Sequence, residues 1–497
     1  MVMPTRRSVL KQGTAIIAMS SFFSACGPKS ATPEGSSGFV DGVGIAEQIS
    51  KGEITAAEAV EAAISRAEAI NPKINAFAYE GFAAAREQVA DLPEGALSGV
   101  PTVMKDLMDW KGMPTLFGSR AFVGNIAQAD GPFSTSWRGH GLVSLGKSTS
   151  PEMGLISSTE PLVTGPTRNP WDTNRKPGGS SGGAAAITAS GIVPFAHASD
   201  GGGSIRIPAS VCGLVGLKPS RGALPTGRAL PPGTPVDISV DLAVTRTVRD
   251  TAALYAATAI SDTAPVTEPG KERLRIAYWN SAMIDDGRSV DPEVAASIQS
   301  VAELCGSLGH TVVEEKMDFD WQQFEQDFLL YWAAGAGAFA QLASEVSGKP
   351  IGPDIVEPWT LGLAGLAQQN AAEIPASVAR LLAFSSFYDQ WFGENNFDLV
   401  LMPTVSRPAD PIGDQSPTRD FDELMQTVTS FAAFTAPMNV SGAASISLPL
   451  GQSSGGLPIG SMFSGRQGDD RKLIALAYEL EEASPWIDRT PPVWAFE

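Results

Sequence analysis

Apolar residues recur at two different spacings along the chain, and each spacing predicts one kind of element. Over residues 55–69 they return every three or four positions, which is typical of an amphipathic helix. Thr55, with Glu58 three positions later, forms a capping-box pattern that places the start of this helix. Residues 99–104 are apolar or small without interruption, so a short buried strand is expected there, with Lys105 at its end.

The segment 321–339 carries large aromatic side chains on one face of a second expected helix. These side chains are Trp321, Phe324, Phe328, Tyr331 and Trp332. A stripe of this kind is usually part of the core, and the alternative is one wall of a substrate pocket. The pattern by itself leaves both interpretations open.

Strand-like runs also occur late in the chain, at residues 398–403 and 444–450. Strands and helices alternate from about residue 40 onward, and no repeat, charge run or low-complexity linker interrupts that stretch. We therefore predict one domain over residues 40–497, of the α/β class, with helices on both faces of a central sheet.

The first residues have the features of an export signal. Arg6, Arg7 and Lys11 are followed by an apolar and small-residue run over 13–25. This run is too short to span a membrane, because a spanning helix needs about 20 residues. The arginine pair ahead of Leu10 and Lys11 favours a twin-arginine signal over an ordinary secretory signal.

We expect a signal peptide over residues 1–25 and a lipid on Cys26, the first residue of the mature chain. Residues 23–26 are similar to a bacterial lipobox, although Phe23 stands where Leu is usual, so cleavage without a lipid is the alternative. Residues 26–39, rich in Gly, Pro and Ser, are expected to form a flexible tether. This interpretation predicts an exported protein of the bacterial periplasm or cell envelope, with the lipid as its only membrane attachment.

Composition narrows the class of partner. The chain of 497 residues is 43% hydrophobic and 18% charged, as globular proteins are, and its net charge is −19. Removal of residues 1–25 would take away three positive charges and no negative ones, leaving −22. Such a charge repels phosphate backbones, so nucleic acid is not an expected partner, whereas a small neutral substrate is compatible with it. The oligomeric state stays open, with a homodimer as one alternative.

The few cysteines and histidines have no metal-ligand spacing, so we expect neither a metal nor another cofactor. If Cys26 carries a lipid, Cys212 and Cys305 remain, and a disulfide between them has no sequence support. Cys212 lies in an apolar stretch, where a buried and inert thiol is the commoner role.

Two serines lie in glycine-rich turns 24 residues apart. Ser180 belongs to the segment 178–183, and Ser204 belongs to the segment 200–206. Glycines beside a serine permit unusual backbone conformations and let a substrate carbonyl approach the main chain closely. Several amides can then point at one oxygen, as an oxyanion hole requires. The pattern therefore favours a nucleophilic serine.

A nucleophilic serine needs a base, and this sequence offers a lysine more readily than a histidine. His140, His197 and His310 lie in turns or in a small-residue strand, so we interpret all three as structural. A Ser-His-Asp triad stays open, because its members can lie far apart in the chain. Lys105 follows an apolar strand, and burial makes a lysine a usable base by disfavouring its charged form. The alternative is a strand-end lysine that reaches water or pairs with a neighbouring aspartate.

These segments resemble the amidase signature family, whose members use a Ser-Ser-Lys triad. The resemblance rests on the spacings of 75 residues from Lys105 to Ser180 and 24 residues from Ser180 to Ser204. The segments 178–183 and 212–219 also match the family pattern. The resemblance implies a single domain with a large twisted mixed sheet covered by helices on both faces. It also implies hydrolysis of carboxylic amides without a cofactor.

The resemblance assigns a role to each triad residue. Ser204 attacks the amide carbonyl, Ser180 relays the proton, and neutral Lys105 accepts it and later returns it to the leaving amine. Ser181 is the close rival of Ser180, and the family spacing alone decides between them.

The resemblance also implies how the nucleophile turn is built. The main-chain amides of its oxyanion hole would be those of Gly201, Gly202, Gly203 and Ser204. Asp200 and Arg206, which flank the turn, would form an ion pair that supports its shape, and Ser181 would support the neighbouring turn.

The nucleophile turn departs from the family pattern at one position, because many members have Ile where this chain has Gly201. The extra glycine is shared with a subgroup that is similar to the hydrolases of cyclic amide dimers of 6-aminohexanoate. The substrate is not fixed by this motif, since we expect the pocket walls in the divergent stretch 315–430. Linear, cyclic, peptide and aryl amides stay open, as does an esterase of the same fold.

Two interpretations from other classes are weaker. Residues 141–148 match the P-loop pattern G-x-x-x-x-G-K-S, but a strand-like run over 142–145 lies where the phosphate-binding loop would have to be. We therefore reject nucleotide binding. A catalytically inactive binding protein is disfavoured because all three triad residues are present.

Overall fold

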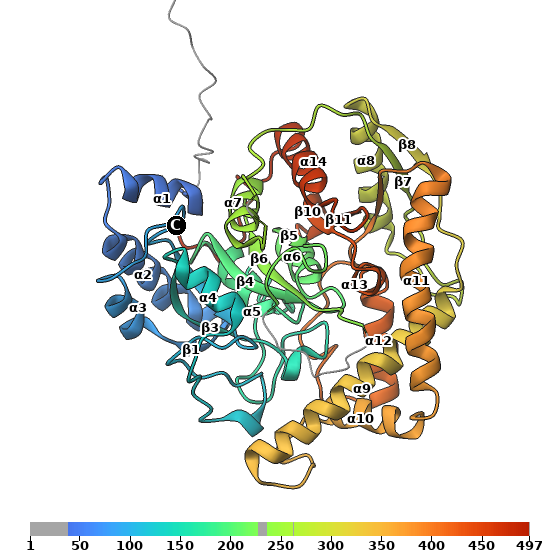
Figure 1. The fold of residues 1–497 in the computed structure, drawn as a ribbon, viewed down its shortest axis with the longest axis horizontal. Helices are drawn as coiled ribbons and strands as arrows, with labels where there is room; N and C mark the ends of the chain where they lie inside the picture. The colour runs from blue at the N-terminus through green and yellow to red at the C-terminus, as the bar shows by residue number, and fades with distance from the viewer. Residues whose placement is uncertain (1–37, 227–235, 262, 497) are drawn as a thin grey trace, which may run out of the picture. The chain divides into compact units, whose positions relative to one another are not determined.

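Two β-sheets organise the chain in the computed structural model, which describes residues 38–226, 236–261 and 263–496 (Figure 1). The strands are β1 (Phe77–Glu80), β2 (Pro101–Lys105), β3 (Val143–Ser148), β4 (Phe195–Asp200), β5 (Val215–Lys218), β6 (Val240–Thr245), β7 (Arg275–Tyr278), β8 (Thr311–Glu314), β9 (Leu399–Pro403), β10 (Ser445–Gln452) and β11 (Pro458–Ser464). The large sheet has the order β4-β6-β5-β10-β11-β9-β7-β8, and the small sheet has the order β1-β3-β2.

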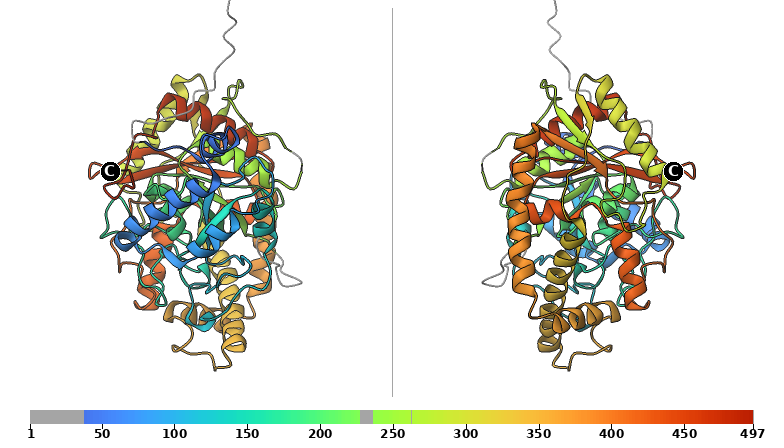
Figure 2. Two further views of the ribbon diagram at one scale, coloured as in Figure 1. Left: turned by 90° about the vertical axis from the view of Figure 1, so that its left-hand side faces the viewer. Right: turned by 90° about the vertical axis from the view of Figure 1, so that its right-hand side faces the viewer.

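The helices are α1 (Gly42–Ser50), α2 (Ala56–Ile74), α3 (Phe82–Gln88), α4 (Pro132–Gly139), α5 (Gly182–Ala189), α6 (Arg206–Cys212), α7 (Val248–Thr258), α8 (Pro292–Ser307), α9 (Trp321–Ser347), α10 (Pro358–Gln369), α11 (Ile374–Asn395), α12 (Phe421–Phe431), α13 (Ala436–Ser441) and α14 (Asp470–Ala483). Two short 3₁₀ helices are η1 (Arg120–Phe122) and η2 (Glu152–Gly154). Figure 2 shows α8 and α14 on one side of the long strands and α9 and α12 on the other.

The large sheet is mixed. Its strands pair antiparallel from β4 through to β9, whereas β9, β7 and β8 pair parallel to one another. Helices cover both faces, so the predicted α/β class with a large mixed sheet is confirmed.

The expected N-terminal helix is α2. Thr55 Oγ1 accepts a hydrogen bond from Glu58 N–H at 3.1 Å, and Glu58 Oε2 accepts one from Thr55 N–H at 2.8 Å, which completes the predicted capping box. The helix continues past residue 69 because Ile70 and Ile74 extend its buried face. It ends where Asn75 adopts a left-handed conformation.

The expected strand before Lys105 is β2, and all five of its residues are buried. Its edge lies against β4, since Thr102 Oγ1 donates to Phe195 O at 3.1 Å and Lys105 N–H donates to His197 Nδ1 at 3.3 Å. His197 Nε2 lies 3.1 Å from Asp241 Oδ1, and burial lowers the pKa of His197. The imidazole is therefore a structural link between strands, as predicted.

The P-loop-like segment is not a loop. Residues 143–148 form β3, and Lys147 is buried, donating to Met108 O and, at 3.0 Å, to Thr115 Oγ1. Its ammonium donates to backbone and side-chain oxygens of the core, so this segment is the strand that the sequence predicted and not a phosphate-binding loop.

The expected signal peptide over 1–25, Cys26 and the tether up to residue 37 lie outside the described residues. Among the helices of the described ranges, none combines the length and the apolar character that a membrane span needs. Cys212 and Cys305 are buried free thiols, and burial raises the pKa of both. The predicted burial of Cys212 is confirmed.

Candidate active site

The fold brings the glycine-rich turns to the end of β2. Lys105 Nζ lies 2.7 Å from Ser180 Oγ, in the turn before α5, and 2.9 Å from Ser199 Oγ, on β4. Ser204 follows β4 in the turn that leads into α6. Lys105 and Ser180 are buried, whereas Ser204 lines a cavity. The structure therefore brings Lys105 and Ser180 into contact, and Ser204 lies in the turn that follows the strand carrying Ser199.

Ser180 and Ser181 have different neighbours. Ser180 Oγ contacts the lysine, whereas Ser181 Oγ donates to Ser199 O and accepts from Ser199 N–H, both at 3.3 Å. Ser181 thus braces the end of β4, and Ser180 is the serine placed to exchange a proton with Lys105.

Sequence reasoning missed Ser199 as a site residue. Its hydroxyl and carbonyl oxygens both accept hydrogen bonds from Lys105 Nζ, at 2.9 and 3.4 Å. These contacts orient the amine toward Ser180. The position of Ser199 directly before Asp200, inside the glycine-rich motif, was the signal that could have identified it.

The nucleophile turn is held by a buried ion pair. Asp200 Oδ2 accepts from Arg206 Nε at 2.9 Å, and Asp200 Oδ1 accepts from Gly203 N–H at 2.7 Å. Both charged side chains are fully buried. Burial alone would raise the pKa of the Asp200 carboxyl, but the charge and hydrogen bonds of Arg206 outweigh burial and hold that pKa well below its usual range. The expected Asp200–Arg206 pair is present.

A residue from α13 completes this network. Asn439 Nδ2 donates to Asp200 Oδ1 at 2.9 Å, and Asn439 Oδ1 accepts from Arg206 Nη2 at 2.7 Å. Sequence reasoning missed Asn439, because it lies more than 230 positions from the turn and carries no local motif.

Gly203 is constrained both in its backbone conformation and in the space around it. Gly203 has a φ of +130°, and a Cβ there would overlap the hydroxyl of Thr435, so a larger residue does not fit. The Gly203 N–H is engaged by Asp200. Of the four amides expected in an oxyanion hole, those of Gly201, Gly202 and Ser204 are the ones left for a ligand.

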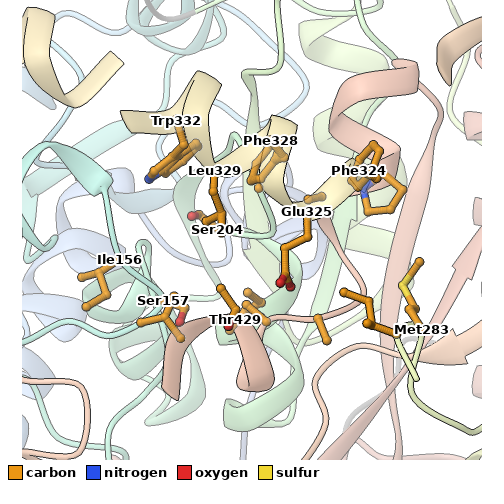
Figure 3. Close-up of a pocket in the computed structure, with 18 of the residues that line it drawn as sticks. Ile156, Ser157, Ser204, Met283, Phe324, Glu325, Phe328, Leu329, Trp332 and Thr429 are labelled. Atoms are coloured by element: carbon orange, nitrogen blue, oxygen red, sulfur yellow. The ribbon is translucent and has the colours of Figure 1, made fainter. Parts of the chain in front are cut away.

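The cavity beside Ser204 has a volume of about 120 Å³ and mostly apolar walls (Figure 3). Its walls come from residues 154–157, from the turn with Ser204, from residues 282–288 and from α9, α10, α12 and α13. The expected stretch 315–430 supplies most of one wall. Residues 154–157 and 282–288 were not expected there, since neither carries a recognisable pocket motif.

The aromatic stripe on α9 is both core and cavity wall. Trp321 and Phe324 belong to a buried aromatic cluster and also line the cavity, as do Phe328 and Trp332. Tyr331 is not among the lining residues, and its hydroxyl donates to Val236 O at 2.5 Å. The sequence left open whether this stripe is core or pocket wall, and the structure shows that it is both.

Two rings of this stripe lie directly over the nucleophile turn. A Cβ at Gly201 would lie 3.3 Å from Trp332 Cζ3, and a Cβ at Gly202 would lie 3.1 Å from Phe328 Cζ. Gly201 does not have a positive φ, so its backbone could accept a side chain. A side chain at position 201 would therefore need the indole of Trp332 to shift, which is consistent with the glycine at this place.

Gly154 and Leu155 line the cavity, and Gly154 lies next to the Ser180 side chain. Leu155 O accepts hydrogen bonds from Trp332 Nε1 at 3.1 Å and from Trp359 Nε1 at 3.0 Å. A Cβ at Gly154 would lie 3.1 Å from Ser180 Oγ. The two tryptophans thus fix a piece of main chain that lies against the Ser180 hydroxyl.

The histidines have structural surroundings. His197 links β2 to β4, His310 Nδ1 accepts from Leu274 N–H at 3.0 Å, and His140 caps the C-terminus of α4. None of the three lines the cavity. Within the described ranges, no group of three or more His, Cys, Asp or Glu side chains could hold a metal ion.

A family model described as Amidase matches residues 58–474 of the sequence. The chain belongs to the amidase family. Its members are hydrolases that act on carbon–nitrogen bonds, and amide hydrolysis is the activity that this membership assigns.

The similarity extends over nearly the whole chain. A relative from Mycobacterium leprae (strain TN), named as the amidase AmiC, is 41% identical over 90% of this chain and 96% of its own length. The 6-aminohexanoate-cyclic-dimer hydrolase of Pseudomonas sp. (strain NK87) is 34% identical over 91% of this chain and 96% of its own length. A solved structure of 6-aminohexanoate cyclic dimer hydrolase complexed with substrate matches with a TM-score of 0.83 at 32% identity, covering 91% of this chain and 98% of that chain.

The Asp200→Asn variant should lose thermal stability and activity together. The substitution leaves the buried Arg206 without its counter-charge, which typically costs about 3–5 kcal/mol, and it loosens the turn that carries Ser204. Thermal unfolding and steady-state hydrolysis of one amide measure the two effects. Glu61→Gln, which removes an exposed ion pair with Arg86, is the matched control and should cost less than about 1 kcal/mol. Lost activity at unchanged stability would contradict the supporting role.

Gly201→Val should lower kcat/KM by about tenfold or more, because the new side chain displaces Trp332 from its contact with the turn. In a Trp332→Ala background the same substitution meets open space, so its effect should be much smaller. A double-mutant cycle on kcat/KM measures the difference, expected at about 1–2 kcal/mol for residues in contact. Equal losses in both backgrounds would show that Trp332 does not decide which residue fits at position 201.

Proposed function

We propose that this protein hydrolyses carboxylic amides through an acyl-enzyme on Ser204. The observation that carries the proposal is the 2.7 Å contact between Lys105 Nζ and Ser180 Oγ, behind the cavity wall that contains Ser204. Membership of the amidase family supports the same chemistry.

The proposed reaction begins with a proton transfer that makes Ser204 nucleophilic. Ser180 takes the proton of the Ser204 hydroxyl and passes its own to Lys105 Nζ, while Ser204 Oγ bonds to the amide carbon. The lysine must be neutral to accept this proton, and burial disfavours its charged form. The proton then returns through Ser180 to the leaving amine. A water molecule uses the same relay to release the acid from Ser204.

The negative charge of the tetrahedral intermediate falls on the former carbonyl oxygen. We propose that the main-chain amides of Gly201, Gly202 and Ser204 stabilise it, because Gly203 N–H is already donated to Asp200. Oriented donors of this kind are worth about 100-fold to 1000-fold in rate for each one removed.

The cavity indicates the kind of substrate. Its walls are mainly aliphatic and aromatic, and its volume of about 120 Å³ suits a small amide rather than a folded polypeptide. One relative is named as a hydrolase of the cyclic dimer of 6-aminohexanoate. We infer that this protein takes small amides with an apolar chain or ring next to the reacting carbonyl.

We also propose that the chain is exported and carries a lipid on Cys26, on the strength of the paired arginines and the lipobox-like residues 23–26. Expression in a bacterium should give a membrane-associated mature chain that begins at a modified Cys26. Cys26→Ser should move the protein out of the membrane fraction. An intact mass that still includes residues 1–25 would overturn this proposal.

Ser204→Ala should abolish turnover without loss of the fold, since it removes one hydroxyl and adds no bulk. Ser180→Ala and Lys105→Ala should each lower kcat on the order of 1000-fold or more, and the double variant should be little worse than either single one because the relay acts as a unit. Ser181→Ala, a serine beside the relay, is the matched control and should have a much smaller effect. Steady-state rates on a neutral anilide, with thermal unfolding as the fold check, decide the matter. Strictly additive losses would contradict a relay.

A further inference from the structure

Two charged side chains face an otherwise apolar cavity. Among the described residues that line it, the charged ones are Glu325 of α9 and Arg288 of the segment before α8. Arg288 Nη1 donates to Glu325 Oε2 at 2.6 Å, and Arg288 Nη2 donates to Glu325 Oε1 at 3.0 Å. In Figure 3 the Glu325 carboxylate points into the cavity, between Ser204 and Met283. A charge at this place is not needed by the proposed relay.

The ion pair is not electrically balanced. Arg288 Nε also donates to both carboxylate oxygens of Asp286, at 3.0 and 2.9 Å, so two carboxylates share one guanidinium. Asp286 is the more exposed of the two and is not among the lining residues. Lys316 Nζ donates to Ala282 O at 2.7 Å, and Lys316 is not among the lining residues. The cavity wall therefore carries a carboxylate and a guanidinium, and the guanidinium is already engaged by two carboxylates.

The distance from the nucleophile turn to Glu325 is set by α9. Phe328 lies over Gly202, and Glu325 precedes Phe328 by three residues, which is about 5 Å along the helix axis. Ser204 and Glu325 line the same cavity, so an acyl chain bound with its carbonyl at the turn can extend toward this carboxylate. The surrounding walls are apolar but Glu325 keeps 26% of its side chain exposed, so a charge on the end of such a chain interacts with Glu325 with less screening by water than at an open surface.

We propose that Glu325, which shares the guanidinium of Arg288 with Asp286, selects the far end of the acyl chain: amides whose chain ends in an ammonium group are preferred over those whose chain ends in a carboxylate. This inference rests on the proposed amide hydrolysis and adds a specificity-determining residue and a substrate class to it. Glu325 acts in binding and orientation of the chain, at a distance from the reacting carbon.

The test uses p-nitroanilides of hexanoic acid, 6-aminohexanoic acid and adipic acid, the last with one carboxyl free. For each enzyme variant, kcat/KM of the ammonium and carboxylate substrates is normalised to the neutral hexanoyl anilide, so a general loss of activity cancels. The wild-type protein should prefer the ammonium over the carboxylate substrate by about tenfold or more. Glu325→Gln should lower this ratio by about tenfold, because the guanidinium of Arg288 then gains free donors toward the cavity.

Arg288→Gln should change the ratio in the opposite direction, because it leaves two carboxylates without their cation. If the pair had only a structural role, both variants would change the ammonium-to-carboxylate ratio in the same direction or leave it unchanged. Glu345→Gln is the matched control, since Glu345 lies on α9 away from the cavity wall. It should leave the ratio unchanged.

The outcomes separate this inference from the proposed function. Turnover of the hexanoyl anilide that depends on Ser204, together with an ammonium-to-carboxylate ratio near one or a ratio unaltered by Glu325→Gln, would overturn the charge selection alone. Turnover that survives Ser204→Ala would overturn the proposed function instead.

Discussion

The buried pair of Asp200 and Arg206 is the interaction on which the site depends. An isolated carboxylate in the core is costly, and this one is stable because the guanidinium, the Asn439 amide and main-chain N–H groups of the turn all donate to it. The network ties the end of β4 to α6 and α13. The turn that presents Ser204 is therefore determined by charge pairing inside the core, and cannot shift without leaving a buried charge unpaired.

A second constraint comes from α9. Its rings lie so close to Gly201 and Gly202 that a side chain at either position would have to move a ring. Trp332 meanwhile donates to Leu155 O and so holds the main chain next to Ser180. The helix α9 thus forms part of the apolar wall and contacts the turn proposed to bind the oxyanion. The same helix carries Glu325. The proposed chemistry and the proposed selection of substrate would therefore both depend on this one helix.

Local patterns sufficed to predict much of the molecule. The capping box of α2, the apolar run of β2 and the glycine-rich turns are contained within short segments, and the spacing of Lys105, Ser180 and Ser204 pointed to one site. Asn439, the 282–288 wall and the contact between Gly201 and Trp332 could not be predicted. Each is a pairing across more than 75 residues, decided by tertiary packing that no local periodicity encodes.

The central claim is that Ser204 carries the acyl group. It is tested most directly by mixing the protein with a slowly deacylating substrate or a sulfonyl fluoride, digesting the product and mapping the modified peptide by mass spectrometry. The account predicts one adduct, on Ser204, that is absent from the Ser204→Ala variant and forms far more slowly in Lys105→Ala. An adduct on Ser180 or Ser181, or turnover without any covalent adduct, would contradict it.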